Sequence, residues 1–257
     1  MFKITRNRRA ASRQQAASKR GEVIPVPFTG ITYPLYLEAV KQPHLLLAGC
    51  TGSGKSTALH ALIYTAILTE PRSRFIMIDP KSIELWRYTV TRQCIYYASE
   101  AIDIMHALQY AEKILLHRFH AMRTSSQVKT SEPPVYIVID EYADIVNTID
   151  RDIKRECMRI IQRVSQLGRA ARIVLWIATQ SPVSSVIDTR IKCNIDARIG
   201  LRTRSKQDSR NIIERAGLEA LPRYGEGYYM SPETSGFVSI PMIQKDEIQR
   251  LINHCRR

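Results

Sequence analysis

The chain has 257 residues and carries 38 Lys and Arg against 24 Asp and Glu, which gives a formal net charge of +14. A hydrophobic content of 44%, with 11 Gly and 12 Pro, is typical of globular proteins and excludes the disordered, collagenous and disulfide-scaffold classes. The excess of positive charge indicates a polyanionic partner.

The cysteines and the apolar runs indicate the compartment. The five cysteines are widely spaced and form no C-x-x-C pair, so neither a disulfide framework nor a zinc cluster is indicated, and a reducing, cytoplasmic compartment is expected. Apolar runs such as 45–48 and 173–178 are strand-length, far shorter than the ~20 residues that cross a bilayer. We therefore expect no membrane insertion by this chain, and any membrane anchor would belong to a partner.

Two short segments precede the main domain. Residues 1–22 are expected to form a flexible basic arm, because seven Lys and Arg and no acid fall within residues 1–20. A solvated tail and a nucleic-acid contact both remain open for this arm. In residues 23–43, Pro25, Pro27 and Pro34 indicate edge strands or turns in a small N-terminal extension.

Strand-like and helix-like segments alternate from His44 onward. This alternation predicts an α/β fold, in which right-handed crossovers join the strands of a parallel sheet with helices on both faces. Ligands of such sheets bind at the carboxyl ends of the strands. Strands are expected at 45–48, 75–78, 135–139, 173–178 and 197–201, and helices at 55–68, in pieces up to about 122, and from about 152 to 167.

A phosphate-binding sequence follows the first strand. Residues 49–56 read Gly-Cys-Thr-Gly-Ser-Gly-Lys-Ser and fit G-x-x-x-x-G-K-[ST] at every fixed position. The glycines allow successive backbone N–H groups to surround phosphate oxygens, and the next helix directs its positive N-terminal end at the same anion. We expect Lys55 to reach the β- and γ-phosphates of ATP, and the Ser56 hydroxyl to bind Mg²⁺. The residues expected to contact the nucleotide are Gly49, Thr51, Gly52, Ser53, Gly54, Lys55, Ser56 and Thr57.

Polar residues end two later strands. Asp140 follows the strand 135–139 and would lie beside the phosphate loop, where it can hold Mg²⁺ through water. Glu141 is the candidate that polarises the attacking water, so the pair indicates hydrolysis rather than binding alone. Gln180 ends the fourth strand, which we expect between the loop strand and the acid-bearing strand, with the amide in reach of the γ-phosphate.

In the order of these motifs the chain resembles the motor domain of the FtsK/SpoIIIE family of hexameric double-stranded DNA translocases. The resemblance implies that residues 44–257 form a RecA-like P-loop ATPase motor domain of the additional-strand type. It begins at 43–49 and continues through the phosphate loop, the Met-Ile-Asp-Pro-Lys block at 77–81, and the blocks 140–144, 168–171, 178–180, 191–195, 208–210 and 216–217.

The resemblance also implies a ring around DNA. In this family ATP lies between neighbouring subunits of a hexamer, and an arginine of the next subunit reaches the γ-phosphate; the matching position is Arg169. The DNA-facing positions of the family match Lys192, Lys206 and Arg210, within a stretch, 190–210, that carries seven Lys and Arg against two Asp. Ser181 stands where family members commonly have Arg, so one channel contact is expected to be missing.

The expected function is movement of duplex DNA through a homohexameric ring, driven by ATP. A coupling ATPase of a conjugative or secretion system, acting on single-stranded DNA or protein, remains open. So does a DNA-binding adaptor whose nucleotide site only controls assembly, although the Asp140 and Glu141 pair argues against it. Long family members carry membrane helices and a sequence-reading winged-helix module, for which this chain has no room, so a membrane-anchored or DNA-loading partner also remains open.

Overall fold

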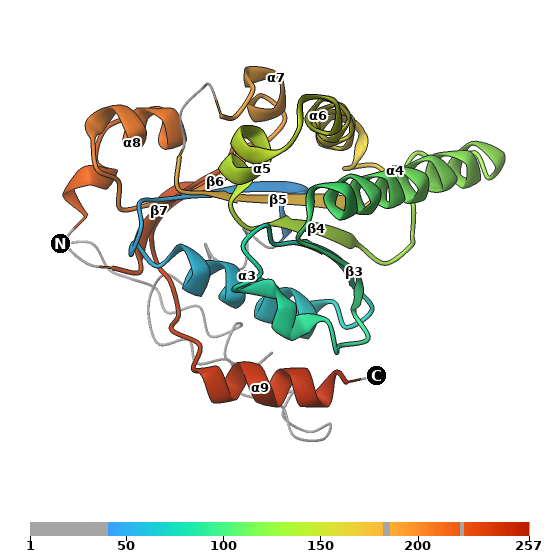
Figure 1. Ribbon diagram of the computed structural model, residues 1–257, viewed down its shortest axis with the longest axis horizontal. Coiled ribbons are helices and arrows are strands. Elements are labelled where there is room, and N and C mark those ends of the chain that lie inside the picture. The colour runs from blue at the N-terminus through green and yellow to red at the C-terminus, as the bar shows by residue number, and fades with distance from the viewer. Residues whose placement is uncertain (1–40, 182–185, 222–223, 257) are drawn as a thin grey trace.

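The computed structural model describes residues 41–181, 186–221 and 224–256. The expected basic arm, 1–22, and residues 23–40 of the expected extension lie outside the described residues. The described chain forms one eight-stranded sheet with helices packed on both faces (Figure 1). The expected α/β fold is therefore confirmed.

The sheet is parallel except at one edge. Its strand order is β3-β2-β4-β5-β1-β6-β7-β8, and β7 pairs antiparallel with both β6 and β8. The expectation of a wholly parallel sheet is thus corrected, because a hairpin extends it beyond β6. The strands are β1 (His44–Ala48), β2 (Arg74–Ile78), β3 (Cys94–Ala98), β4 (Val135–Ile139), β5 (Ile173–Thr179), β6 (Ala197–Leu201), β7 (Glu226–Met230) and β8 (Ser235–Ser239).

The five expected strands are all present, and their ends agree with the expected ends within one residue. Every residue of β1, β4, β5 and β6 is buried, which explains their unbroken apolar runs. Strands β3, β7 and β8 were not expected, and β3 falls in a stretch expected to be helical. All three lie toward the sheet edges, where polar and small residues such as those of β8 (Ser-Gly-Phe-Val-Ser) weaken the apolar signal.

The helices form one layer on each face (Figure 1). Leu45 and Leu47 of β1 pack into the core on the side of α3 and α9, whereas Leu46 and Ala48 pack into the core beneath α4, α5 and α6. In the described ranges no helix combines the length and apolar character needed to span a membrane. The helices are α3 (Lys55–Thr69), α4 (Ala101–Thr124), α5 (Tyr142–Thr148), α6 (Arg151–Leu167), α7 (Thr189–Lys192), α8 (Lys206–Ile213) and α9 (Lys245–His254), with 3-10 helices η1 (Leu85–Tyr88) and η2 (Leu218–Ala220).

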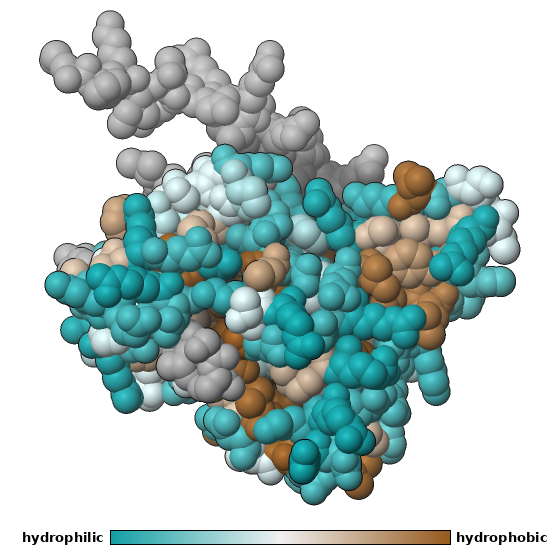
Figure 2. Space-filling view, turned by 90° about the horizontal axis from the view of Figure 1, so that it is seen from above, coloured by the Kyte–Doolittle hydropathy of each residue, from teal (hydrophilic) through white to brown (hydrophobic). Residues whose placement is uncertain are grey.

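Charged side chains fasten α4 to α6. Arg159 and Arg163 of α6 lie 2.7 and 2.9 Å from the carboxylate of Glu112 on α4. Hydrogen bonds from Arg159, with help from Arg163, hold the pKa of Glu112 below its usual range. Figure 2 shows this side of the molecule as mainly hydrophilic, with smaller hydrophobic areas between the charged residues. The contact orients α6, which leads directly into the turn that carries Arg169.

Strand β5 lies between β1 and β4 and pairs in parallel with both, as expected. The strand that ends in Gln180 therefore separates the phosphate-loop strand from the strand that precedes Asp140. Because all three run in the same direction, their carboxyl ends meet at one edge of the sheet. Segments far apart in sequence, 49–56, 140–141 and 179–180, are thus brought to one place.

At the opposite, amino edge of the sheet His44 links β1 to β5. Its Nδ1 accepts a hydrogen bond from the backbone N–H of Leu175 at 3.1 Å, and the residue is 3% exposed. Burial lowers the pKa of His44 to about 4. The imidazole is therefore neutral at neutral pH, which is the form that can accept this bond.

Acidification should weaken the fold through His44. The pKa is lower in the folded chain than the ordinary value of 6.5, so the unfolded chain takes up the proton first and stability falls between pH 6.5 and 4. The loss is about 3 kcal/mol. A His44→Asn variant keeps an acceptor that does not titrate, so its free energy of unfolding in urea should fall less steeply over this range. Equal slopes for the variant and the wild type would contradict the assignment.

Candidate nucleotide-binding site

The phosphate loop turns from β1 into α3 through glycines in positions that side chains disfavour. Gly52 and Gly54 have φ of +78° and +96°. At Gly49 a Cβ atom would lie 2.6 Å from Ser53 Oγ and 2.7 Å from Leu201 Cβ. The loop delivers the chain to the N-terminus of α3, where the first backbone N–H groups of a helix have no partner within the helix. The spacing of the motif thus follows from backbone geometry that suits an anion.

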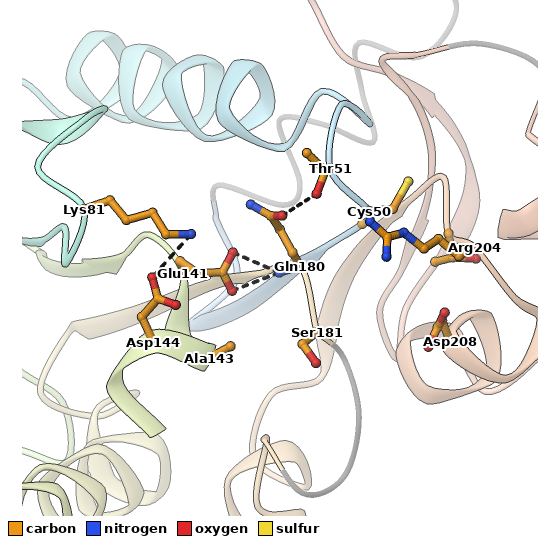
Figure 3. A pocket seen from close by; sticks show the side chains of 12 residues that line it. Cys50, Thr51, Lys81, Glu141, Ala143, Asp144, Gln180, Ser181, Arg204 and Asp208 are labelled. Carbon is orange, nitrogen blue, oxygen red and sulfur yellow. Dashed lines mark hydrogen bonds and ion pairs between the residues drawn. The ribbon is translucent and has the colours of Figure 1, made fainter. Parts of the chain in front are cut away.

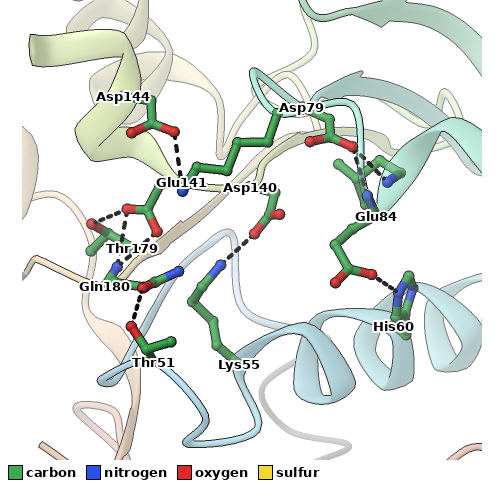
Figure 4. Close-up of polar contacts among 12 residues, drawn as sticks. Thr51, Lys55, His60, Asp79, Glu84, Asp140, Glu141, Asp144, Thr179 and Gln180 are labelled. Atoms are coloured by element: carbon green, nitrogen blue, oxygen red, sulfur yellow. Dashed lines mark hydrogen bonds and ion pairs between the residues drawn. The ribbon is translucent and has the colours of Figure 1, made fainter. Parts of the chain in front are cut away.

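Lys55, the first residue of α3, forms an ion pair with Asp140 directly after β4 (Figure 4). Both side chains are 7% exposed. Burial raises the pKa of Asp140, and the Lys55 ammonium opposes this shift. An arriving phosphate would compete with the Asp140 carboxylate for the Lys55 ammonium.

Glu141 follows Asp140 in the chain, and its carboxylate is held at the end of the neighbouring strand β5. Its backbone has φ +67°, an uncommon conformation for a residue with a side chain. Its carboxylate accepts hydrogen bonds from the Thr179 hydroxyl and from the backbone N–H of Gln180, each at 3.0 Å (Figure 4). Strained backbone conformations of this kind are concentrated at functional sites. Sequence reasoning missed Thr179, although a polar residue ending an apolar strand was a signal.

Gln180 connects Glu141 to the phosphate loop. Its side-chain oxygen accepts a hydrogen bond from the Thr51 hydroxyl at 2.7 Å, while its backbone N–H binds Glu141. The contacts run from the end of β4, across the end of β5, to the loop (Figure 4). A phosphate between the loop and Glu141 would therefore lie beside the Gln180 amide.

A cavity of about 400 Å³ opens over this edge of the sheet (Figure 3). Its size is in the range of small-molecule sites. Lys81 enters from the loop after β2 and lies 3.3 Å from Asp144 of α5, and Arg204 lines the other side from the loop after β6. Sequence reasoning gave Lys81 and Asp144 no role, because their proximity depends on the pairing of β2 with β4.

The loop after β2 also brings a carboxylate near Ser56. Asp79 accepts hydrogen bonds from the backbone N–H groups of Glu84 and Leu85, each at 2.9 Å. Glu84 lies 2.9 Å from His60 of α3. The His60 contact lowers the pKa of Glu84 to about 2, with a smaller contribution from the Ser56 hydroxyl. Glu84 is therefore ionised beside the residue expected to bind Mg²⁺, a contact that the sequence spacing did not show.

Ser56 and Asp140 fit a magnesium ion. A hydroxyl and a carboxylate are the oxygen ligands that Mg²⁺ prefers, and this ion usually keeps several waters and binds few protein groups. In the part of the chain that the structure describes, no group of three or more His, Cys, Asp or Glu is placed to hold a metal alone. A magnesium ion here would depend on nucleotide phosphates and water for its other ligands.

Arg169 lies apart from these residues. It precedes β5 at the amino edge of the sheet, whereas the phosphate loop follows β1 at the carboxyl edge. There it lines a second cavity together with Lys129 and Arg172. Within one chain Arg169 therefore lies at the opposite end of β5 from Gln180.

The residues expected to contact DNA lie on two helices. Lys206 and Arg210 are one turn apart on α8, and both are exposed. Lys192 ends α7 and is partly buried, and burial lowers its pKa. Arg198 was counted in the same basic stretch, but it is 7% exposed on β6 and lies 2.7 Å from Glu214. The prediction that residues 190–210 form one basic surface is therefore corrected at Arg198, which is a buried cation that stabilises the fold.

The family model described as the FtsK/SpoIIIE family matches residues 6–125. Relatives named DNA translocase FtsK are 30% identical over 85% of this chain in Pseudomonas putida and 30% identical over 86% in Helicobacter pylori. The predicted resemblance to the FtsK/SpoIIIE family is confirmed. The chain spans about a third of the length of these relatives, 31% and 28% respectively.

Solved structures share the fold. The conjugation coupling protein TcpA of pCW3 has a TM-score of 0.71 at 24% identity, over 81% of this chain and 64% of that chain. The type VII secretion ATPase EccC of Thermomonospora curvata has a TM-score of 0.69 at 21% identity, over 83% of this chain and 28% of that chain. These likenesses, together with the sheet order, confirm the RecA-like P-loop ATPase fold.

The pairing of Lys55 with Asp140 should appear as energetic coupling. Removal of Lys55 alone leaves a buried carboxylate without a counter-charge, whereas removal of both charges leaves none. Lys55→Ala and Asp140→Asn should each lower the free energy of unfolding, and the double variant should lose less than their sum by about 1 to 3 kcal/mol. Chemical denaturation of the four proteins measures this difference. Strictly additive losses would mean that the two groups do not stabilise each other.

Proposed function

We propose that this chain hydrolyses ATP in the cytoplasm and uses the energy to move double-stranded DNA. The observation that carries the proposal is the convergence of the phosphate loop, Asp140, Glu141 and Gln180 at one edge of the sheet, where the loop, Glu141 and Gln180 line a cavity of about 400 Å³. The relatives named DNA translocase FtsK support the DNA part of the proposal.

The phosphate loop would bind the triphosphate. Backbone N–H groups of residues 49–56 would surround the phosphate oxygens, and Lys55 would exchange part of its contact with Asp140 for the β- and γ-phosphates. Ser56 and Asp140 would hold Mg²⁺, which neutralises phosphate charge when bound. Thr57, the next residue of α3, completes the set that we assign to nucleotide binding.

Glu141 is the group that we assign to the attacking water. Water attacks the γ-phosphorus, its proton passes toward the Glu141 carboxylate, and the bond from the γ-phosphorus to the bridging oxygen of the leaving ADP breaks. Gln180 touches Thr51 on the loop and Glu141 at once. Loss of the γ-phosphate would therefore change contacts on both sides of β5, which gives the strand a means of reporting hydrolysis.

The proposed assembly is a homohexameric ring. A head-to-tail ring joins two different surfaces of neighbouring subunits. In the proposed ring one subunit's amino edge faces the next subunit's carboxyl edge, so Arg169 would reach the neighbour's γ-phosphate. An arginine in that position can raise phosphoryl-transfer rates by about 10³ to 10⁵ by neutralising transition-state charge. The location of Arg169 at the edge opposite its own phosphate loop supports this role.

Lys192, Lys206 and Arg210 are the proposed contacts with duplex DNA. Contacts with the phosphate backbone hold any sequence, as a motor that moves along DNA requires. Lys206 and Arg210 are exposed on one face of α8, so they present a paired positive surface. The Ser at position 181 leaves this surface one cation short of the common family pattern.

Duplex DNA should stimulate ATP hydrolysis. Steady-state turnover should rise more with long duplex DNA than with single-stranded DNA of equal nucleotide concentration, and the gain should fall as salt is raised. The Lys206→Ala, Arg210→Ala double variant should flatten the salt dependence of duplex binding by about two units of slope. Arg250→Ala is the matched control. Arg250 is an exposed arginine that pairs with Asp246 within α9, and α9 covers the face of the sheet opposite to α8.

The outcome separates the proposal from its rival. Stimulation by single strands alone, or turnover that duplex DNA leaves unchanged, would contradict the proposal and favour a coupling ATPase of a conjugative or secretion system. Loss of turnover in a folded Lys55→Ala variant would support the site, and normal turnover in that variant would overturn it.

A further inference from the structure

The proposed site fixes which way a nucleotide must lie. Asp140 and Gln180 follow β4 and β5, so the γ-phosphate end belongs on that side of the phosphate loop. On its other side β1 pairs with β6, and β7 follows next in the sheet. A nucleotide whose phosphates lie on the loop therefore extends its sugar and base toward the ends of β6 and β7.

Two segments at these strand ends are held to the phosphate loop by backbone hydrogen bonds. The backbone N–H of Cys50 donates to the carbonyl oxygen of Arg202, directly after β6, at 2.9 Å. The backbone N–H of Gly225, directly before β7, donates to the carbonyl oxygen of Ser53 at 3.1 Å. The side chains of Arg202 and Tyr224 are thereby carried at the rim of the loop, on the side away from Glu141.

Tyr224 offers an aromatic face at this rim. It is 70% exposed, and its Cε1 lies 3.9 Å from the position that a Cβ on Gly52 would occupy. The guanidinium of Arg202 lies 6.0 Å from the centroid of its ring. A ring this exposed gains little from burial in the fold, so core packing does not explain its place beside a phosphate loop.

We propose that Tyr224, supported by Arg202, is the stacking platform for the base of the bound nucleotide. The inference rests on the proposed function of the loop as an ATP site and adds the group that holds the other end of the nucleotide. An aromatic ring binds any base through its flat face, whereas discrimination between bases needs hydrogen bonds to their edges. The platform should therefore strengthen binding of ATP and of GTP by similar factors.

Equilibrium binding of three ligands tests the platform. Dissociation constants for ATP, GTP and inorganic tripolyphosphate, which has the phosphates but no base, are measured by calorimetry with Mg²⁺ present. Tyr224→Ala should weaken ATP and GTP about tenfold and leave tripolyphosphate unchanged within about twofold. Tyr224→Phe keeps the ring and should bind all three as the wild type does. Arg202→Gln should show a smaller loss confined to the two nucleotides.

A control variant and the Lys55→Ala variant distinguish failure of the Tyr224 platform from failure of the proposed nucleotide site. Tyr110→Ala on α4 removes a partly exposed tyrosine far from the loop in the fold and should bind all three ligands normally. Equal weakening of tripolyphosphate and ATP binding by Tyr224→Ala would overturn the platform, because the ring would then act by shaping the loop. Unchanged ATP affinity in the same variant would also overturn it. A Lys55→Ala variant that binds ATP as tightly as the wild type would overturn the proposed site itself.

Discussion

The insertion of β5 between β1 and β4 is the constraint on which the rest of this structure depends. It places Gln180 between the phosphate loop and Glu141, so that one residue contacts both, the loop through its side-chain oxygen and Glu141 through its backbone N–H. Arg169 precedes this strand and Gln180 follows it, so the two residues lie at its opposite ends. Seven extended residues separate these ends by roughly 20 Å. In the proposed ring, one strand would therefore connect a subunit's own nucleotide with the nucleotide of its neighbour.

The positive charge of the chain divides into buried and exposed groups with different roles. Arg118 of α4 is 8% exposed and donates at 2.7 Å to the carbonyl oxygens of Ala171 and Pro133, which fixes the turns before β5 and β4. Arg198 likewise serves the fold. Burial without partners would make such charges costly, so each is bound to carbonyl or carboxylate oxygens. Lys206 and Arg210 of α8 are exposed instead, and they are the cations that we propose to contact DNA.

The sequence predicts the buried parallel strands and the phosphate loop well, because burial on both faces and a glycine-dependent turn leave local patterns in the residues. It predicts Asp140, Glu141 and Gln180 as neighbours because parallel strands share an edge. It does not predict β3 or the β7 and β8 hairpin, whose edge positions demand less apolar sequence. Nor does it show that Glu84 approaches Ser56 or that Tyr224 approaches Gly52, because those contacts arise from the packing of segments distant in the chain.

We propose that the site at the end of β5 drives movement along duplex DNA. The most direct measurement is displacement of a triplex-forming oligonucleotide from long duplex DNA by the chain with ATP and Mg²⁺. We expect displacement by the wild type and none by Lys55→Ala or by Arg169→Ala, although the Arg169 variant should still bind ATP. A wild-type chain that hydrolyses ATP and leaves the third strand in place would contradict the proposal, as would displacement that continues without Lys55.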